Sequence, residues 1–229
     1  MRLSPRLQTA AELCPRGAVL CDVGSDHGKL PAALVEAGVC PSAIATDIGE
    51  GPAARAEQTV ALCGLSRQIS VRRCDGLTGV QAGECTAVSI CGLGGEVMEH
   101  ILTGSPWSFD KTLILQPQSK AEVLRACLYR NGVAIEREVP VLDRGRCYSV
   151  MLARRTGRPV PSPDDRLSLL LGGIPAEPAG PAKRAYIQKV LARQRRILMG
   201  MLYLTETAEG ADRQQTIVDQ LKEVLDTCL

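Results

Sequence analysis

The chain has 229 residues and a formal net charge of +2; 45% of its residues are hydrophobic and only 3% are aromatic. The length allows one α/β domain with a small appendage, and the hydrophobic fraction is large enough for a packed core, which excludes a disordered chain. The scarcity of aromatic rings argues against a base-stacking sheet of the kind found in small RNA-binding domains, which need several ring side chains.

Short apolar runs alternate with helical segments from the N-terminus to about residue 153. Buried parallel strands are predicted at residues 18–23, 42–48, 69–72, 86–91 and 111–117. Helices are predicted at residues 7–13, 30–37, 53–63, 96–102 and 121–130. Two further strands, at 133–139 and 147–152, predict an antiparallel edge. This order indicates right-handed βαβ units in an open sheet with helices on both faces.

The last third of the chain has a different pattern, with two proline-rich stretches followed by two helical stretches. One helical stretch reaches Leu204 and the other reaches Cys228, each with apolar residues every three or four positions, and Glu209-Gly210 is predicted to separate them. We therefore predict an α/β domain over residues 1–155 and a small α-helical domain over 156–229, built as an antiparallel coiled-coil hairpin.

The ten cysteines form no Cys-x-x-Cys pair, and neither histidine lies at zinc-ligand spacing from a cysteine, so we expect no bound metal. No apolar stretch is long enough to span a membrane, and no secretory signal precedes the fold. We expect a cytoplasmic protein with buried, reduced cysteines and no membrane contact, which is a monomer or a weak homodimer.

The loop after the first predicted strand carries the sequence Asp22-Val23-Gly24-Ser25-Asp26-His27-Gly28. Gly24 permits a tight turn, Gly28 allows the next helix to pack on the strand, and free N–H groups at the helix start favour an anionic group. The spacing is not the dinucleotide pattern, and acids at positions 22 and 26 would lie where a pyrophosphate must sit, which disfavours NAD. A ligand with an amine and a carboxylate, such as the methionine end of S-adenosylmethionine, fits better.

Three further loops follow predicted strands. Asp47 can accept both hydroxyls of a ribose, Asp75 can bind an adenine amino group, and the glycines at 92, 94 and 95 let a flat substrate approach the backbone. Taken singly, Asp47 can also be a helix cap and Asp75-Gly76 an ordinary turn, and one glycine-rich loop is weak evidence, but four such loops in the right order predict one pocket. The predicted cofactor-binding residues are Asp22, Gly24, Ser25, Asp26, His27, Asp47, Ile48, Asp75, Gly76, Cys91, Gly92 and Gly94.

Four motifs of the chain are DVGSDHGKLP, the stretch Asp47-Ile48-Gly49-Glu50-Gly51-Pro52, ICGLGG and LILQP. Together they resemble the bacterial tRNA (adenine-22-N1)-methyltransferase family, often called TrmK, from about Ser4 to about Leu152 and more weakly beyond. The resemblance implies a Rossmann-like class I methyltransferase domain with a C-terminal coiled-coil domain, S-adenosylmethionine as cofactor and tRNA as substrate. Four positions depart from the family pattern: Leu93 replaces a frequent Met, Gln118 a usual Asn, and Gly28-Lys29 a common Ala-Tyr.

Methylation at adenine N1 needs little acid–base help, because this nitrogen has an in-plane lone pair and is mostly unprotonated near neutral pH. The site must align the reacting atoms and stabilise the cationic product. An acceptor near the exocyclic amine would serve both purposes, and Asp26 and then Gln116 are the catalytic candidates. Asp26 is equally explained as a ligand of the cofactor amine or of a loop N–H, and His27 as a structural hydrogen-bonding residue.

A uniformly basic helix is predicted near the C-terminus, with no acid between Ala182 and Thr205. The predicted phosphate-binding residues are Lys183, Arg184, Lys189, Arg193, Arg195 and Arg196, with Arg6 extending the basic surface. A solvated charged face is the alternative. The function predicted is therefore transfer of a methyl group to N1 of adenine 22 in tRNA; the alternatives are a methyltransferase acting on another RNA, a protein or a small molecule, and an RNA-binding protein with a decayed pocket.

Overall fold

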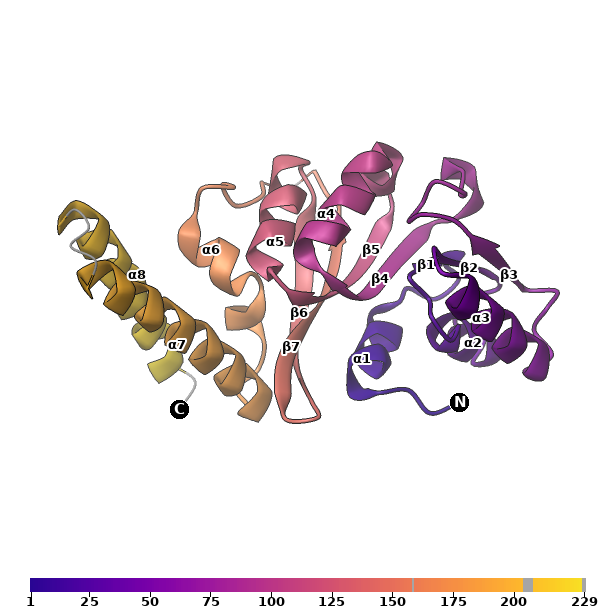
Figure 1. Ribbon diagram of the computed structural model, residues 1–229, viewed down its shortest axis with the longest axis horizontal. Coiled ribbons are helices and arrows are strands. Elements are labelled where there is room, and N and C mark those ends of the chain that lie inside the picture. Colours follow the sequence, from indigo (N-terminus) through magenta and orange to yellow (C-terminus); the bar gives the residue numbers. More distant parts are fainter. Residues whose placement is uncertain (158, 204–207, 228–229) are drawn as a thin grey trace.

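The computed structural model describes residues 1–157, 159–203 and 208–227. A seven-stranded sheet forms its centre, in the order β3-β2-β1-β4-β5-β7-β6 (Figure 1). The strands are β1 (Leu20–Val23), β2 (Ala43–Asp47), β3 (Ile69–Arg73), β4 (Ala87–Gly94), β5 (Thr112–Ser119), β6 (Ala134–Asp143) and β7 (Arg146–Arg154). The first five are parallel, and β7 runs antiparallel to β5 and β6, which confirms the predicted sheet with an antiparallel edge.

Helices cover both faces of the sheet. The helices of this part are α1 (Pro5–Leu13), α2 (Lys29–Glu36), α3 (Glu50–Leu62), α4 (Gly95–Gly104) and α5 (Ala121–Arg130). One core layer joins α4 and α5 to the sheet through residues such as Met98, Leu102 and Leu124. The other joins α1, α2 and α3 through residues such as Leu13 and Leu30. The short, almost fully buried strands explain why the sequence shows continuous apolar runs instead of alternation.

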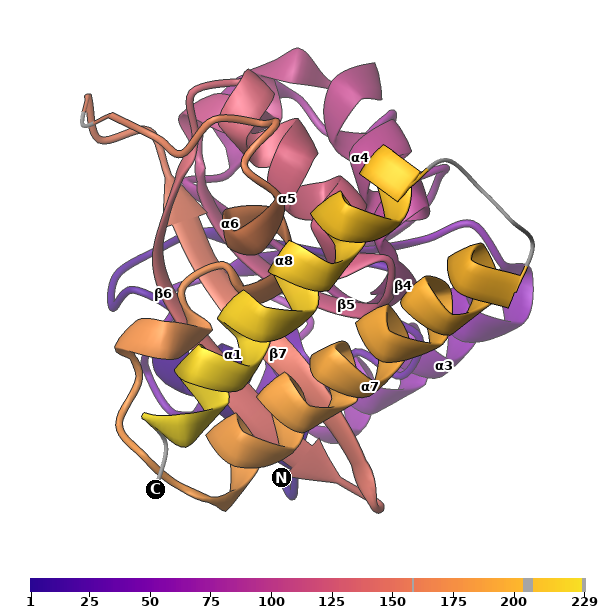
Figure 2. The same cartoon turned by 90° about the vertical axis from the view of Figure 1, so that its left-hand side faces the viewer.

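The C-terminal part contains α6 (Arg166–Leu171) and two long helices, α7 (Pro181–Tyr203) and α8 (Ala208–Asp226), which run side by side at one end of the molecule (Figures 1 and 2). They share a separate apolar cluster that includes Ile187, Leu191 and Leu221. The expected break at Glu209-Gly210 is wrong, because both residues lie in the first turn of α8. A glycine costs little there, since first-turn N–H groups have no partner within the helix, and the acid favours the positive helix end. Leu204, Thr205 and Cys228 lie outside the described residues.

A buried charge cluster joins the helical part to the sheet. Arg125 of α5 and Glu138 of β6 are 1% and 0% exposed and form an ion pair, with Nε donating to Oε2 over 3.2 Å. The guanidinium also donates to the carbonyls of Leu169 and Leu170 in α6, and over 2.7 Å to the hydroxyl of Tyr186 in α7. We call Arg125, Glu138 and Tyr186 the junction cluster. It ties one end of α7 to the edge of the sheet.

Among the described residues, no helix is long and apolar enough to cross a bilayer. The same residues contain no group of three or more His, Cys, Asp or Glu side chains placed to hold a metal ion. The nine cysteines that the structure describes are free thiols.

Candidate active site

The four predicted loops meet at the carboxyl edge of the parallel strands, beside the point where the strand order reverses between β1 and β4. In the loop between β1 and α2, Gly24, Asp26 and Gly28 have φ values of 67°, 48° and 64°, in the left-handed region. This loop therefore turns its backbone sharply at three positions, and the N–H groups of Ser25 and Gly28 are hydrogen-bonded to carbonyls of the fold. Gly28 has a different role from the one we predicted, because an added Cβ would meet the backbone of Ala56 in α3 at 3.3 Å.

Asp22 lies beneath this loop and is 4% exposed. Its two carboxylate oxygens accept hydrogen bonds from the hydroxyls of Ser25 and Ser89, each over 2.6 Å. Burial raises the pKa of Asp22 to about 6, although the two serine hydrogen bonds oppose that shift. Asp22 thus connects the loop to β4 from inside the fold, and a cofactor amine would have to share these oxygens with the two serines.

Asp47 connects the first loop to the second. Its Oδ2 accepts the N–H of Asp26 over 3.1 Å and its Oδ1 accepts the N–H of Gly49 over 3.0 Å. Ile48, the next residue, is 65% exposed, which is unusual for a large apolar side chain and leaves a hydrophobic surface beside the acid. Asp47 and Ile48 together offer oxygen acceptors and an apolar contact at one place, as a nucleoside requires.

The third loop is bonded to the second through Thr46, whose hydroxyl donates to the carbonyl of Gly76 over 2.9 Å. The exposed carboxylate of Asp75 lies in this loop. In the fourth loop, Gly92 has a φ of 88° and faces the side chain of Gln118. At position 95 glycine is required by packing and not by a substrate, because a Cβ there would lie 2.1 Å from a backbone oxygen of residue 120. The four loops form one continuous wall.

Asp26 is the most accessible acid of the first loop, with a side chain that is 56% exposed. Its Oδ1 accepts a hydrogen bond from Arg55 of α3 over 2.8 Å, and Nε2 of His27 lies 3.5 Å from its Oδ2. Arg55 was not predicted, because it lies in α3, outside the motifs of the sequence. The carboxylate remains open to a ligand, while Arg55 holds it toward α3.

Gln116 does not have the place that we predicted for an acceptor of the adenine amine. Its side chain is 1% exposed, its Oε1 accepts from Arg6 over 3.1 Å and its Nε2 donates to the carbonyl of Pro117. Arg6 also donates to Asp143 over 2.8 Å. Gln116 and Arg6 are thus engaged in the fold, and the exposed side chain of Gln118 takes the place at the glycine loop. The unusual glutamine after Pro117 was the only sequence signal for it.

The predicted basic residues of α7 differ in their surroundings. Lys183 is buried and its ammonium donates to two backbone carbonyls, so its predicted phosphate contact is wrong. Lys189 is exposed and donates to the carbonyl of Cys147, and Arg193 pairs with Glu122 over 2.7 Å. Arg195 and Arg196 are exposed, and Arg184 is half-buried. The structure therefore leaves only part of the helix available to RNA.

Comparison with known proteins yields a consistent set of relatives. Residues 3–151 match a family described as a methyltransferase domain. The chain is 34% identical over 229 residues to the tRNA (adenine(22)-N(1))-methyltransferase of Bacillus subtilis (strain 168). This match covers 99% of this chain and 89% of that protein. The crystal structure of the B. subtilis M1A22 tRNA methyltransferase TrmK has a TM-score of 0.82 at 31% identity and covers 99% of this chain and 98% of its own. Streptococcus pneumoniae Sp1610, solved in complex with S-adenosyl-L-methionine, has a TM-score of 0.83 at 28% identity, with 98% and 100% covered.

Proposed function

Because this chain belongs to the tRNA (adenine(22)-N(1))-methyltransferase family, we propose that it transfers a methyl group from S-adenosylmethionine to N1 of adenine 22 in tRNA. The observation in the structure that carries this proposal is the wall of four loops at the switch point of the sheet, where hydrogen bonds join the first three loops and Leu93 of the fourth lies beside Gly24 of the first. It presents exposed acids, left-handed glycines and one exposed apolar side chain to a single ligand.

The residues present fit S-adenosylmethionine, which supplies an electrophilic methyl group when bound. We assign Asp47 to the ribose hydroxyls, Ile48 to a face of the cofactor adenine and Asp75 with Gly76 to its amino edge. Gly24, Ser25, Asp26 and His27 border the methionine end, with Asp22 behind them. Cys91, Gly92 and Gly94 lie where cofactor and substrate meet. Burial and the nearby carboxylate of Asp22 raise the pKa of the Cys91 thiol, which disfavours its thiolate form.

The chain has to position the acceptor adenine and stabilise the positive charge that its ring gains. We assign the alignment of the adenine to Gln118 and the backbone at Gly92, which face each other beside the cofactor wall. The exposed carboxylate of Asp26 can stabilise the product charge, since a fixed anion close to a developing cation lowers the barrier. No proton has to be removed from N1 before attack, so the site needs no general base.

The experiment that tests this function starts from unmodified tRNA. The enzyme and S-adenosylmethionine are incubated with it, and the digested nucleosides are analysed by mass spectrometry. We expect 1-methyladenosine, and its absence with every tRNA would contradict the proposal. Asp26→Asn then separates the two roles of Asp26: a lower kcat at saturating cofactor supports charge stabilisation, whereas weaker cofactor binding with unchanged kcat supports binding alone.

Three further properties remain part of the proposal. We place the enzyme in the cytoplasm with its tRNA substrate, and we expect a monomer or a weak homodimer, which sedimentation velocity would distinguish. We also keep the functional division into a cofactor-binding part, residues 1–155, and a tRNA-binding helical part, residues 156–229. The exposed cations of α7 support the second assignment.

A further inference from the structure

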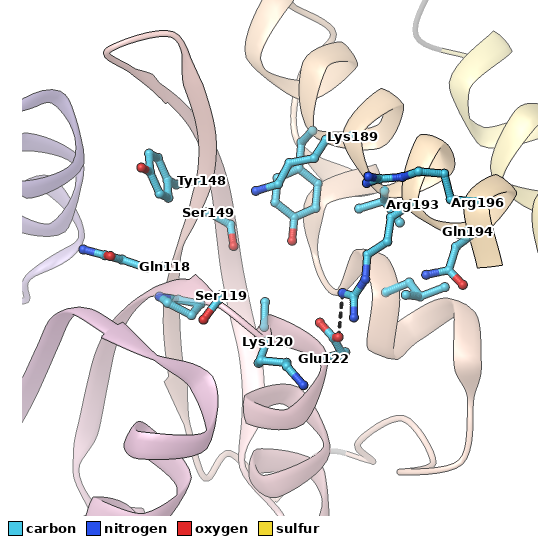
Figure 3. A pocket seen from close by; sticks show the side chains of 15 residues that line it. Gln118, Ser119, Lys120, Glu122, Tyr148, Ser149, Lys189, Arg193, Gln194 and Arg196 are labelled. Carbon is cyan, nitrogen blue, oxygen red and sulfur yellow. Dashed lines mark hydrogen bonds and ion pairs between the residues drawn. The ribbon is translucent and has the colours of Figure 1, made fainter. Parts of the chain in front are cut away.

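A cavity of about 300 Å³ separates α7 from the end of β5 and from β7 (Figure 3). We propose that this cavity binds one nucleotide of the tRNA next to the acceptor adenosine, with its sugar or base inside and its phosphate at the mouth. This inference rests on the proposed function. The volume is at the lower end of the range for small-ligand sites, which suits a single nucleotide.

The floor of the cavity contains a polar group without a partner. Ser149 of β7 lines the cavity and is 2% exposed, and its Oγ has no hydrogen-bond partner at normal distance among the described residues, although the hydroxyl of Tyr186 lies close enough to interact with it. Buried hydroxyls are nearly always hydrogen-bonded, because leaving one unpaired costs free energy. Figure 3 shows Ser149 on the wall opposite α7, facing the cavity. A ligand hydroxyl or ring nitrogen would supply the missing partner.

A second polar group comes from α7. Gln194 lines the cavity and is 1% exposed, and its Oε1 accepts a hydrogen bond from Gln214 of α8 over 3.0 Å. This bond fixes the orientation of the amide and leaves the amino group as a donor. Ser149 and Gln194 therefore offer a ligand both hydroxyl and amide contacts from opposite walls, which is the donor and acceptor set that a ribose or a base edge needs.

Cations lie at the mouth on one face of α7. Lys189, Arg193 and Arg196 line the cavity and recur at intervals of four and three residues, so they project from the same side of the helix. Hydrogen bonds from the backbone and Arg193 keep the pKa of Glu122 below its ordinary value although burial raises it, so Glu122 is an anion that offsets Arg193. Arg196 forms no hydrogen bond or ion pair with a described residue and is the cation most available to a phosphate.

The cavity borders the proposed reaction site. Gln118 and Ser119 line it, and the side chain of Gln118 also faces Gly92 in the glycine loop. A nucleotide in the cavity would thus lie beside an adenine held at that loop, which is where the chain neighbour of the acceptor must be. Single-stranded or extruded nucleotides are bound in this manner, by a pocket for the base or sugar and cations for the backbone.

An arginine outside α7 provides a matched control. Arg196→Gln removes a charge from the cavity, whereas Arg67→Gln removes the same charge from an exposed position between α3 and β3. We expect Arg196→Gln to raise the KM for tRNA about tenfold, to leave the dissociation constant of S-adenosylmethionine unchanged, and to lower the slope of log K against log salt by about 0.7 to 0.9, the value for one phosphate contact. Arg67→Gln should change each quantity much less, and equal effects of the two variants would overturn the proposal.

The floor is tested by Ser149→Val, which replaces the hydroxyl that faces the cavity with a methyl group of similar size and adds a second methyl group. Ser70→Val is the control, since Ser70 is an exposed residue of the edge strand β3. We expect Ser149→Val to raise the KM for tRNA at least fivefold with an unchanged melting temperature and unchanged cofactor binding. A wild-type KM for tRNA would overturn the proposal. Formation of 1-methyladenosine by the wild-type enzyme is measured separately, so the proposed function can hold while the cavity fails.

Discussion

The cofactor wall and the junction cluster contain the same kinds of charged residue in opposite surroundings. Asp26 and Asp75 of the wall are exposed, and the carboxylate of Asp26 pairs with an arginine that is itself about half exposed. Arg125 and Glu138 of the junction are almost wholly excluded from solvent and are paired and hydrogen-bonded from several elements. The wall keeps its oxygens accessible for a ligand, whereas the junction uses its charges to hold the C-terminal helices against the sheet.

This difference has energetic consequences. An exposed charge that loses its partner is solvated by water, so the pair contributes little to stability. A buried charge that loses its partner is left in a medium of low polarity, which costs several kcal/mol. Substitutions in the wall should therefore change ligand binding more than folding, and substitutions in the junction should change folding first.

Removal of the junction arginine gives the largest expected effect. Arg125→Met leaves Glu138 buried without its cation, and we expect the free energy of unfolding to fall by about 3–5 kcal/mol. Arg130→Met is the control, because Arg130 is 54% exposed in its pair with Glu99 and should contribute about 0–1 kcal/mol. Chemical denaturation measures both. Similar losses of unfolding free energy for the two variants would show that burial does not make the Arg125 ion pair more important than the exposed pair of Arg130.

Gly172 is a second test of the junction. Its φ is 54°, and an added Cβ would lie 2.0 Å from Oε2 of Glu138. Gly172→Ala should therefore lower stability by about 2–4 kcal/mol, from the left-handed backbone and the forced displacement of the ion pair. Gly180→Ala, where nothing lies within 4 Å, should change stability by less than about 1 kcal/mol. A melting temperature unchanged by Gly172→Ala would show that the junction is loosely packed.

Asp22 is an exception among the charged residues of the wall, because it is buried. Its pKa is raised from 3.8 to about 6, so between these values the folded chain binds more protons than the unfolded chain. The contribution of the Asp22 carboxyl to the free energy of unfolding is fully present below pH 4 and is lost as the pH rises through 6. This loss is at most about 3 kcal/mol. We expect Asp22→Asn to make the free energy of unfolding less dependent on pH over this range and to raise that free energy at pH 7. A pH dependence identical to that of the wild type would show that Asp22 has no such role.

Asp47 gives the smallest expected effect in free energy. Asp47→Ala should weaken S-adenosylmethionine binding at least tenfold, or about 1.4 kcal/mol, because it removes the proposed acceptor for the ribose and two contacts that hold the loops. Glu50→Ala is the control, since Glu50 is an 83% exposed acid three residues away. Calorimetric titration measures both. Equal affinities of the two variants for S-adenosylmethionine would show that Asp47 does not bind the cofactor.

The order of elements and the meeting of the four loops at one edge of the sheet could be predicted because both depend on local rules. Strand and helix periods, glycine turns and acids at strand ends are visible in short windows of sequence, and parallel strands bring such ends to one edge. The same reasoning indicated a basic helix. It did not separate Arg196, which faces the cavity, from Lys183, which is buried under two carbonyl contacts.

The rest depends on contacts between distant residues. Nothing in the sequence around Arg125 indicates that Glu138 and Tyr186 complete its hydrogen bonds. The engagement of Gln116 by Arg6 joins the first helix to the fifth strand across 110 residues. Gly28 was assigned to the wrong packing partner for the same reason, since the turn is local but its neighbour in α3 is not. Tertiary pairing decides which polar residues remain free for a ligand.

The proposed reaction is methylation of N1 of adenine 22 in tRNA. The most direct measurement compares two transcripts of one tRNA, one with adenine and one with guanine at position 22, in transfer of a labelled methyl group from S-adenosylmethionine. We predict label in 1-methyladenosine at position 22 of the first transcript and none in the second. Equal labelling of both transcripts, or label in a different nucleoside, would contradict the account.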